Sequence, residues 1–353
     1  MDKKKIIKCN NCNNFGHTVK KCDRPILSYG IICIYLDQYP SILDYITKAY
    51  THSGKKKSFF YQNTHLPPPK YYYPSKDKAS TAAYRPPFYQ RSVDRFINRN
   101  SCSVSHHLYN FYYSNLKNNV YFLMVKKTHS LSYIRLIRGQ YNIHNKLEII
   151  DMIHKLSKKE YKLILELEFD QLWEDIFSIH HKKKYYGEYQ TSKQNFNLLK
   201  DSQWLHMEIP QYEDQEWEFP KGKRERGETR IACAKREFFE ETGIQENNIV
   251  ILDQLDPLIE NLTGTNGLKY KYIYYIAVYK GYHKDIVTTR DALEISEVNW
   301  SLLEKAQKII RPYHQEKLFL LNKVYNFILL NIIYYYEIKQ NFFTTEHQTP
   351  SIL

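Results

Sequence analysis

The chain has 353 residues, enough for two or three domains with buried cores. Its formal net charge of +13 favours a polyanionic partner, and its 33 tyrosines offer stacking surfaces, although such richness is also typical of a biased genome. Six cysteines without a signal peptide argue against a disulfide framework, and no apolar run is long enough to span a bilayer. We therefore expect an intracellular protein that binds no membrane.

Residues 1–24 contain the metal-ligand spacing C-x2-C-x4-H-x4-C, made by Cys9, Cys12, His17 and Cys22. Three thiolates and one imidazole predict a closed, structural Zn²⁺ site, and the metal would supply the folding energy that so short a segment lacks. With Phe15 and Gly16, the segment resembles the retroviral-type zinc knuckle, which implies binding of single-stranded RNA. A protein-binding or purely structural zinc module is the alternative.

Two predicted strands flank a long irregular region. Residues 25–37 contain SYGIICIYLD, whose β-branched residues indicate a buried strand. Residues 119–128 indicate a second strand, which we expect to pair with the first. Residues 38–118 are rich in Pro, Tyr and Lys without helical or strand period, which predicts a flexible insertion. RNA tracking and a passive linker are both open interpretations of this insertion.

Residues 129–205 carry apolar side chains at helical spacing, including Ile149, Ile153, Leu163 and Leu167. They predict a small helical accessory domain. Its basic residues favour an RNA-binding platform, and the alternative is an insertion that only stabilises the fold.

The central stretch runs from Phe219 to Ile244 and predicts a strand end, a basic loop and a helix. Thr229 is a suitable N-cap, and Gly243 is suited to the left-handed residue that ends a helix. Residues at helical spacing should face a core, and these are Ile231, Ala232, Ala234, Phe238 and Phe239.

Three glutamates, Glu237, Glu240 and Glu241, cluster on the opposite side of this helix. Like charges at this spacing repel, and a hard cation such as Mg²⁺ that also binds phosphate oxygens resolves the conflict. A solvated acidic face is the alternative. Lys221 and Lys223 precede the helix, where they either contact phosphate or are merely solvated.

Further strands are predicted at IVILDQL, at residues 269–281 and at EISEVNW, and two helices are predicted after them. The second of these helices covers about residues 318–336. Its apolar run is interrupted by Asn322, Lys323, Asn326 and Asn331, which argues against a membrane span.

The spacing of the central stretch resembles the Nudix box, whose fixed positions are filled by Gly222, Glu228, Arg236, Glu237, Phe238, Glu240, Glu241, Gly243 and Ile244. The resemblance implies an α+β fold, the Nudix α/β/α sandwich with a mixed sheet, with a catalytic domain at residues 206–345 and the box at residues 222–244. It also implies a hydrolase that uses Mg²⁺ or Mn²⁺.

Carried over residue by residue, the resemblance makes Glu237 and Glu241 the main metal ligands. It makes Glu240 a further ligand or the base on water, and it gives Glu228 a supporting role at a metal. Arg236 would orient Glu237.

The strand SYGIIC, the helical insertion and WEFPKGK leading into REFFEETGI are similar to the mRNA-decapping Nudix hydrolases of large cytoplasmic DNA viruses. EISEVNW is similar to a segment that adds one glutamate to the site of decapping enzymes, which would be Glu294. The likeness implies capped mRNA as the partner, cleavage of the cap pyrophosphate and action in the host cytoplasm, with packaging in the virion left open. A diphosphoinositol polyphosphate or nucleotide pyrophosphohydrolase is the alternative, and a non-catalytic RNA-binding module is a third hypothesis.

Overall fold

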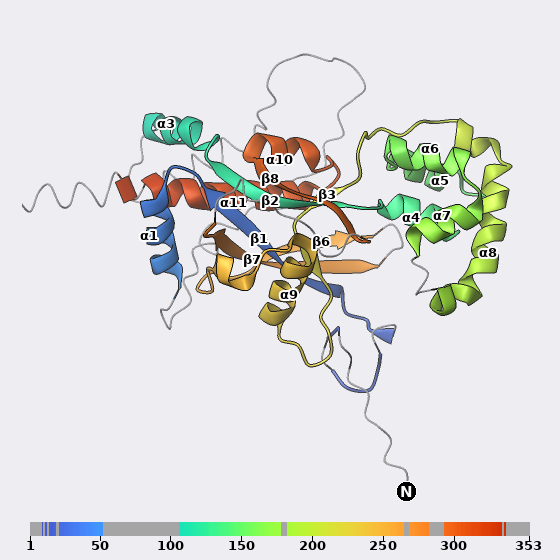
Figure 1. Cartoon of the computed structure of the whole chain (residues 1–353), viewed down its shortest axis with the longest axis horizontal. Coiled ribbons are helices and arrows are strands. Elements are labelled where there is room, and N and C mark those ends of the chain that lie inside the picture. The colour runs from blue at the N-terminus through green and yellow to red at the C-terminus, as the bar shows by residue number, and fades with distance from the viewer. Residues whose placement is uncertain are drawn as a thin grey trace, which may run out of the picture.

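The computed structural model describes residues 9, 11–12, 14–18, 21–51, 106–177, 182–264, 268–281, 293–333 and 335–336 (Figure 1). Most of the insertion predicted at residues 38–118 lies outside these described residues.

A mixed sheet of eight strands forms the centre of the described chain. The strands are β1 (Ile26–Leu36), β2 (Val120–Lys127), β3 (Trp217–Glu218), β4 (Lys221–Gly222), β5 (Ile249–Ile251), β6 (Leu258–Thr263), β7 (Lys269–Tyr279) and β8 (Ile295–Leu302). β1 runs parallel to β7 and antiparallel to β2, so the predicted pairing of the first two strands is confirmed. The other strand pairs are antiparallel. β6 was not predicted from the sequence.

Helices cover both faces of this sheet, and a separate group of helices lies beside it (Figure 1). The α-helices are α1 (Pro40–Tyr50), α3 (His106–Leu116), α4 (Leu131–Ile137), α5 (Lys146–His154), α6 (Lys158–Glu166), α7 (Phe169–Ile176), α8 (Lys182–Lys200), α9 (Arg230–Thr242), α10 (Leu303–Ile309) and α11 (Gln315–Ile333). Two short 3₁₀ helices span Gln203–His206 and Glu246–Asn248.

The alternation of β1 divides its side chains between two cores. Ile31 and Cys33 pack with α9, in the same core as Phe238. Ile32 and Ile34 face the opposite core, which α1, α10 and α11 cover. The arrangement is the α/β/α sandwich of the predicted α+β class.

Helix α9 begins and ends as expected. The Thr229 hydroxyl accepts a hydrogen bond from the backbone N–H of Ala232 at 3.2 Å, and Gly243 ends the helix at φ 72°. The core face is rotated relative to the prediction, however: Ala232 is exposed and Cys233 is fully buried. The Cys233 thiol lies 3.7 Å from the Gly222 carbonyl oxygen, so the loop before the helix covers this position. The prediction of a core position at Ala232 was wrong.

Helices α1 and α3 lie at the two ends of the region where residues 38–118 showed no periodicity. Pro40 stands at the start of α1, where its missing N–H costs no hydrogen bond, and Ile42 and Ile46 are fully buried. The Tyr50 hydroxyl donates to Asn331 of α11 at 3.2 Å. The prediction of an irregular segment therefore differs from the structure at both ends of this region.

Helices α4 to α8 have a hydrophobic core of their own, which includes Leu136, Ile153, Trp173 and Phe196. The helical spacing read from the sequence corresponds here to several short helices, and the RNA-binding role of this group stays a prediction. Among the residues that the structure describes, no helix combines the length and apolar character that a membrane crossing needs.

Candidate active site

Strand β4 holds the loop before α9 directly against β1. Gly222 and Lys221 pair with Tyr29 and Gly30, and Ile31 N–H donates to the Pro220 carbonyl at 3.2 Å. A Cβ atom at Gly30 would lie 2.2 Å from the Pro220 oxygen, so only glycine permits this close approach. The loop and the helix of the box are thereby fixed to the central sheet.

Arg236 lies at the centre of the carboxylates of α9 and its preceding loop. Its Nε and Nη2 donate to the two oxygens of Glu228 at 2.9 and 3.1 Å. Its Nη1 donates to Glu240 at 2.8 Å, and its Nη2 lies 3.0 Å from Glu237 Oε1. Burial alone would raise the pKa of Glu228, but the hydrogen bonds from Arg236 and from the Glu225 N–H lower it.

Glu237 lies directly against Gly222. A Cβ atom at Gly222 would be 2.0 to 2.3 Å from the three carboxyl atoms of Glu237, so this glycine leaves the space that the carboxylate occupies. Burial raises the pKa of Glu237 to about 7, the nearby Arg236 opposes the rise, and the charges of Glu241 and Glu240 add to it. A second cation beside Glu237 would therefore be stabilising.

Glu241 is buried in the last turn of α9. Its Oε2 accepts a hydrogen bond from the Lys221 N–H at 2.8 Å, and its Oε1 lies 3.2 Å from Lys127 Nζ. Burial raises the pKa of Glu241, and the charges of Lys127 and Lys221 oppose the rise.

Lys127 and Glu218 extend this charge network, and neither was predicted from the sequence to belong to the site. Lys127 Nζ lies 3.1 Å from Glu218 Oε1, while Glu218 Oε2 lies 2.7 Å from Lys221 Nζ and 3.6 Å from Lys317 Nζ. Burial would raise the pKa of Glu218, but the lysines hold it well below its ordinary value. A charged residue inside the apolar segment Trp217–Phe219 was the available signal, because such a residue is seldom buried without a partner.

Lys221 and Lys223, the two predicted phosphate ligands, differ in the exposure of their side chains. The Lys221 side chain is mostly buried, with its ammonium paired to Glu218 and 4.8 Å from the centre of the Tyr272 ring. The Lys223 side chain is exposed, and its carbonyl accepts from Arg236 at 3.0 Å. Of the two, Lys223 has its side chain in solvent beside the box.

Glu294 lies exposed immediately before β8. Its carbonyl oxygen accepts a hydrogen bond from the Thr128 N–H at 2.9 Å, which places it beside Lys127. Burial would lower the pKa of Lys127, but the charges of Glu218, Glu241 and Glu294 raise it. The structure thus brings Glu294 to the edge of the same charge network as the box.

The box supplies the hard oxygen donors that Mg²⁺ and Mn²⁺ prefer, and burial together with the charges of Glu241 and Glu240 raises the pKa of partly buried Glu237. In the structure, however, the four carboxylates are distributed around Arg236 and Lys127 as ion pairs. Binding of a shared metal would require rotation of carboxylate side chains away from these partners.

The N-terminal segment forms the tight group of metal-ligating atoms that its spacing predicted. One ligand atom from each of Cys9, Cys12, His17 and Cys22 lies within 4.8 Å of all the others. Tetrahedral zinc–thiolate bonds of about 2.3 Å require separations of roughly 3.8 Å, so small movements suffice. A hydrogen bond from Asn11 lowers the pKa of Cys22 to about 6, which favours the thiolate that a metal binds.

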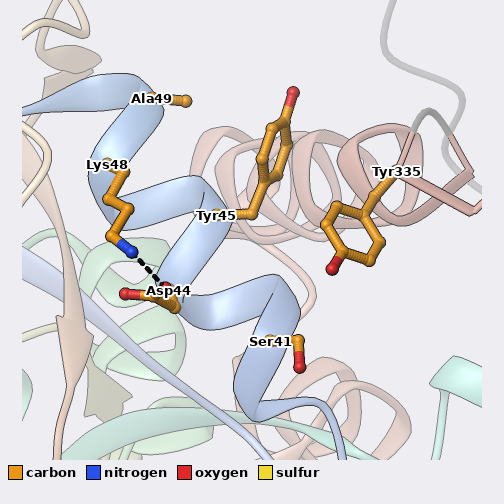
Figure 2. Close-up of a pocket in the computed structure, with 6 residues that line it drawn as sticks. All are labelled: Ser41, Asp44, Tyr45, Lys48, Ala49 and Tyr335. Carbon is orange, nitrogen blue, oxygen red and sulfur yellow. Dashed lines mark hydrogen bonds and ion pairs between the residues drawn. The ribbon is translucent and has the colours of Figure 1, made fainter. Parts of the chain in front are cut away.

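A surface hollow lies elsewhere, on α1, and is lined by Ser41, Asp44, Tyr45, Lys48, Ala49 and Tyr335 (Figure 2). Its only charged groups are Lys48 and Asp44, which are exposed and paired with each other at 2.7 Å. It contains no residue of the box and no cluster of catalytic groups, so we assign it no function.

Comparison with known proteins agrees with the box. The family described as NUDIX domain matches residues 192–320. A putative mRNA-decapping protein of Acanthamoeba polyphaga mimivirus is 31% identical over 354 residues, which cover 92% of this chain and 95% of that protein. The mRNA-decapping protein g5R of African swine fever virus (isolate Pig/Kenya/KEN-50/1950) is 30% identical over 228 residues, covering 60% of this chain and 89% of that protein. A C. elegans Ap4A hydrolase in a binary complex is 27% identical with a TM-score of 0.27, and the match covers 32% of this chain and 78% of that structure.

Proposed function

The chain belongs to the Nudix hydrolase family, and from that premise we propose that it hydrolyses the 5′ cap pyrophosphate of mRNA. The products would be 7-methylguanosine diphosphate and RNA with a 5′-monophosphate. The observation that carries the proposal is the likeness to a putative viral decapping protein along 92% of the chain. Action in the host cytoplasm is part of the same proposal.

Glu237 and Glu241 would be the main ligands of Mg²⁺ or Mn²⁺, with Glu240 as a third ligand or the base on water and Glu228 in support. Such a metal, when bound, lowers the pKa of a water molecule and neutralises the charge of the pyrophosphate. The proximity of Glu228, Glu237 and Glu240 at one guanidinium supports this assignment, and a metal would take the place of some of these ion pairs.

Arg236 and Lys127 would position these glutamates before the substrate arrives. Arg236 contacts Glu228 through Nε and Nη2, Glu237 through Nη2 and Glu240 through Nη1, so its planar guanidinium fixes their relative orientation. Lys127 of strand β2 forms an ion pair with Glu241, and the charge of Glu294 also acts on this lysine. With its side chain in solvent, Lys223 is better placed than Lys221 to contact a phosphate.

Two other parts of the chain would bind the RNA body. The zinc knuckle of residues 1–24 would hold Zn²⁺ through Cys9, Cys12, His17 and Cys22 and bind single-stranded RNA. The helices of residues 129–205 would form a second RNA-binding surface. The net charge of +5 on residues 1–24, from seven Lys and Arg and two Asp, supports the first assignment, and the run of Lys182, Lys183 and Lys184 supports the second.

The experiment that tests the proposal is product identification from RNA carrying a labelled cap, with Mg²⁺, with Mn²⁺ and without metal. We expect labelled 7-methylguanosine diphosphate only when metal is present. Diphosphoinositol polyphosphates and free nucleotides serve as competing substrates. Faster turnover of either than of capped RNA would overturn the decapping assignment in favour of a small-molecule pyrophosphohydrolase.

Glu240→Gln is the matched active-site variant. The change removes one charge at a half-exposed position, so we expect turnover to fall by at least ~100-fold while RNA binding and folding persist. The control is Glu246→Gln, an exposed position just beyond the helix that pairs with Lys235. Equal turnover of Glu240→Gln and the unaltered protein would show that this glutamate has no catalytic role.

A further inference from the structure

The side chain of Asn11 joins the zinc-ligand segment to the central sheet. Its Oδ1 accepts a hydrogen bond from the Leu27 N–H at 2.9 Å, and its Nδ2 donates to the Pro25 carbonyl at 2.9 Å. The same Nδ2 lies 3.3 Å from Cys22 Sγ. Asn11 is only 8% exposed, so these bonds are largely shielded from water.

Asn11 therefore contacts both a proposed zinc ligand and the first residues of β1. Asn11 lies between the proposed ligands Cys9 and Cys12 and is not itself a ligand, so metal binding does not require an asparagine at this position. The side-chain amide accepts from a backbone N–H and donates to a backbone carbonyl of the same extended segment, as the backbone of a neighbouring strand would. The contact consequently fixes the position and orientation of the knuckle relative to β1.

This attachment point is close to the box. Leu27 precedes Gly30 by three residues, which is about 10 Å along a strand, and Gly30 pairs with Lys221 of the box loop. The parallel neighbour β7 begins at the same edge, where Tyr270 pairs with Ile26. The knuckle thus lies beside the strand edge from which the catalytic loop extends.

The knuckle and this edge carry groups that suit single-stranded RNA. Phe15 is 64% exposed, so its ring lies at the surface, where a base can reach it. Lys21 and Arg24 are exposed at the end of the knuckle that leads into β1, and Lys269 is exposed at the start of β7. These cations can follow a phosphate backbone from the knuckle towards the box.

We propose that Asn11 docks the zinc knuckle onto the catalytic sheet, so that RNA bound at Phe15 lies at a fixed, short distance from the box. The proposal rests on the decapping function proposed above. The docking point at Leu27 lies about 10 Å along β1 from Gly30, which pairs with the box loop, so the docked knuckle holds nucleotides near the capped end. An undocked knuckle would still bind zinc and RNA, but it would no longer place the capped end in the site.

The test compares the full-length, zinc-loaded protein with Asn11→Ala and with the control Asn14→Ala, whose side chain is exposed in the same segment. Zinc content is measured first and is expected to be one per chain in all three proteins. Hydrogen exchange is then followed in peptides that cover residues 24–29. We expect the Leu27 amide to exchange at least tenfold faster in Asn11→Ala and to be unchanged in Asn14→Ala.

The functional readout is the ratio of kcat/KM for a capped 25-nucleotide RNA to kcat/KM for a cap dinucleotide. We expect Asn11→Ala to lower this ratio at least tenfold, because kcat/KM for the capped RNA falls while kcat/KM for the dinucleotide is unchanged. Unchanged exchange at Leu27, or an unchanged ratio in Asn11→Ala, would overturn the proposal. If Asn11→Ala loses zinc, Asn11→Asp is measured instead with the kcat/KM ratio alone as its readout, since it keeps the oxygen that accepts from Leu27 but turns the donor to Pro25 into a carboxylate oxygen that repels the carbonyl. The ratio should then fall at least tenfold, and an unchanged ratio would overturn the proposal.

The two readouts separate this proposal from the function on which it rests. Exchange at Leu27 is measured without RNA, so it tests the docking contact even for a protein that does not cleave caps. Faster exchange in Asn11→Ala together with no cleavage of capped RNA by the unaltered protein would support docking and reject decapping.

Discussion

At the scale of single residues, the box depends on very close contacts between glycines and charged groups. Arg236 gathers three glutamates, and Gly222 leaves room for the carboxylate of one of them, Glu237. Such contacts determine where carboxylate oxygens point, and therefore where a metal can bind. Small side-chain changes here should alter catalysis more than stability.

Gly222→Ala tests this expectation. The added methyl group would meet the Glu237 carboxyl atoms at 2.0 to 2.3 Å, and this carboxylate is the end of a flexible side chain that can turn away. We expect kcat to fall by about 10- to 100-fold, as for other changes that misplace a metal ligand, with unfolding free energy changed by less than about 1 kcal/mol. Metal-dependent turnover and denaturant unfolding measure the two quantities.

Gly187→Ala is the control for Gly222→Ala, because nothing lies within 4 Å of a Cβ atom at Gly187. It should leave turnover unchanged and slightly stabilise α8. Wild-type turnover in Gly222→Ala would mean that the observed position of Glu237 is irrelevant to the reaction.

At the scale of helices and strands, the sequence was most informative where local chemistry decides the structure. The hydroxyl of Thr229 and the left-handed conformation of Gly243 fix the ends of α9, so both ends were predictable. Which side of α9 faces the core was not predictable. The loop that buries Cys233 is held by pairing with β1, which lies nearly two hundred residues earlier in the chain. Local periodicity carries no information about such a contact.

The partners of the box glutamates were missed for the same reason. The spacing of α9 predicted that Glu237, Glu240 and Glu241 cluster, but Lys127 reaches Glu241 from β2 across a sequence separation of 114 residues. Only the order of strands in the sheet brings them together. A sequence pattern can thus name the carboxylates of a site more readily than the cations that hold them.

Glu160 connects two helices of the accessory group and allows a test at this scale. Its Oε2 accepts from the Ser157 N–H at 2.8 Å, and its Oε1 accepts from the N–H of Ser130, the N-cap of α4, at 2.5 Å. It is 1% exposed. One carboxylate therefore caps α6 and fixes the start of α4, and both helix N-termini favour its negative charge.

Glu160→Gln should destabilise this helical group by about 2 kcal/mol, because an amide replaces a charged acceptor that receives two N–H groups and the Ser157 hydroxyl. Glu166→Gln, at an exposed position of the same helix, should have little effect. Hydrogen exchange across α4 to α8 measures the loss. Turnover of a cap dinucleotide should persist, since the box belongs to a different core, and a parallel loss would mean that the two cores unfold together.

At the scale of the whole molecule, charge is unevenly distributed along the chain. Residues 1–24 contain seven Lys and Arg and two Asp, a net charge of +5 within a total of +13. More than a third of the excess positive charge thus belongs to the short segment that the knuckle occupies. If RNA binds there, much of its affinity should come from release of counterions.

The salt dependence of RNA affinity measures this contribution. The slope of log K against log[salt] for a single strand is about −0.7 for each phosphate neutralised, so loss of several contacts is readily detected. We expect a steep slope for a 25-nucleotide RNA, a shallow slope for a cap dinucleotide, and a decrease of at least ~2 in the RNA slope when residues 1–24 are removed. Fluorescence anisotropy between 50 and 300 mM salt provides the data. The same slope with and without residues 1–24 would place the RNA contacts on the helices of residues 129–205 instead, because they are the other part of the chain proposed to bind the RNA body.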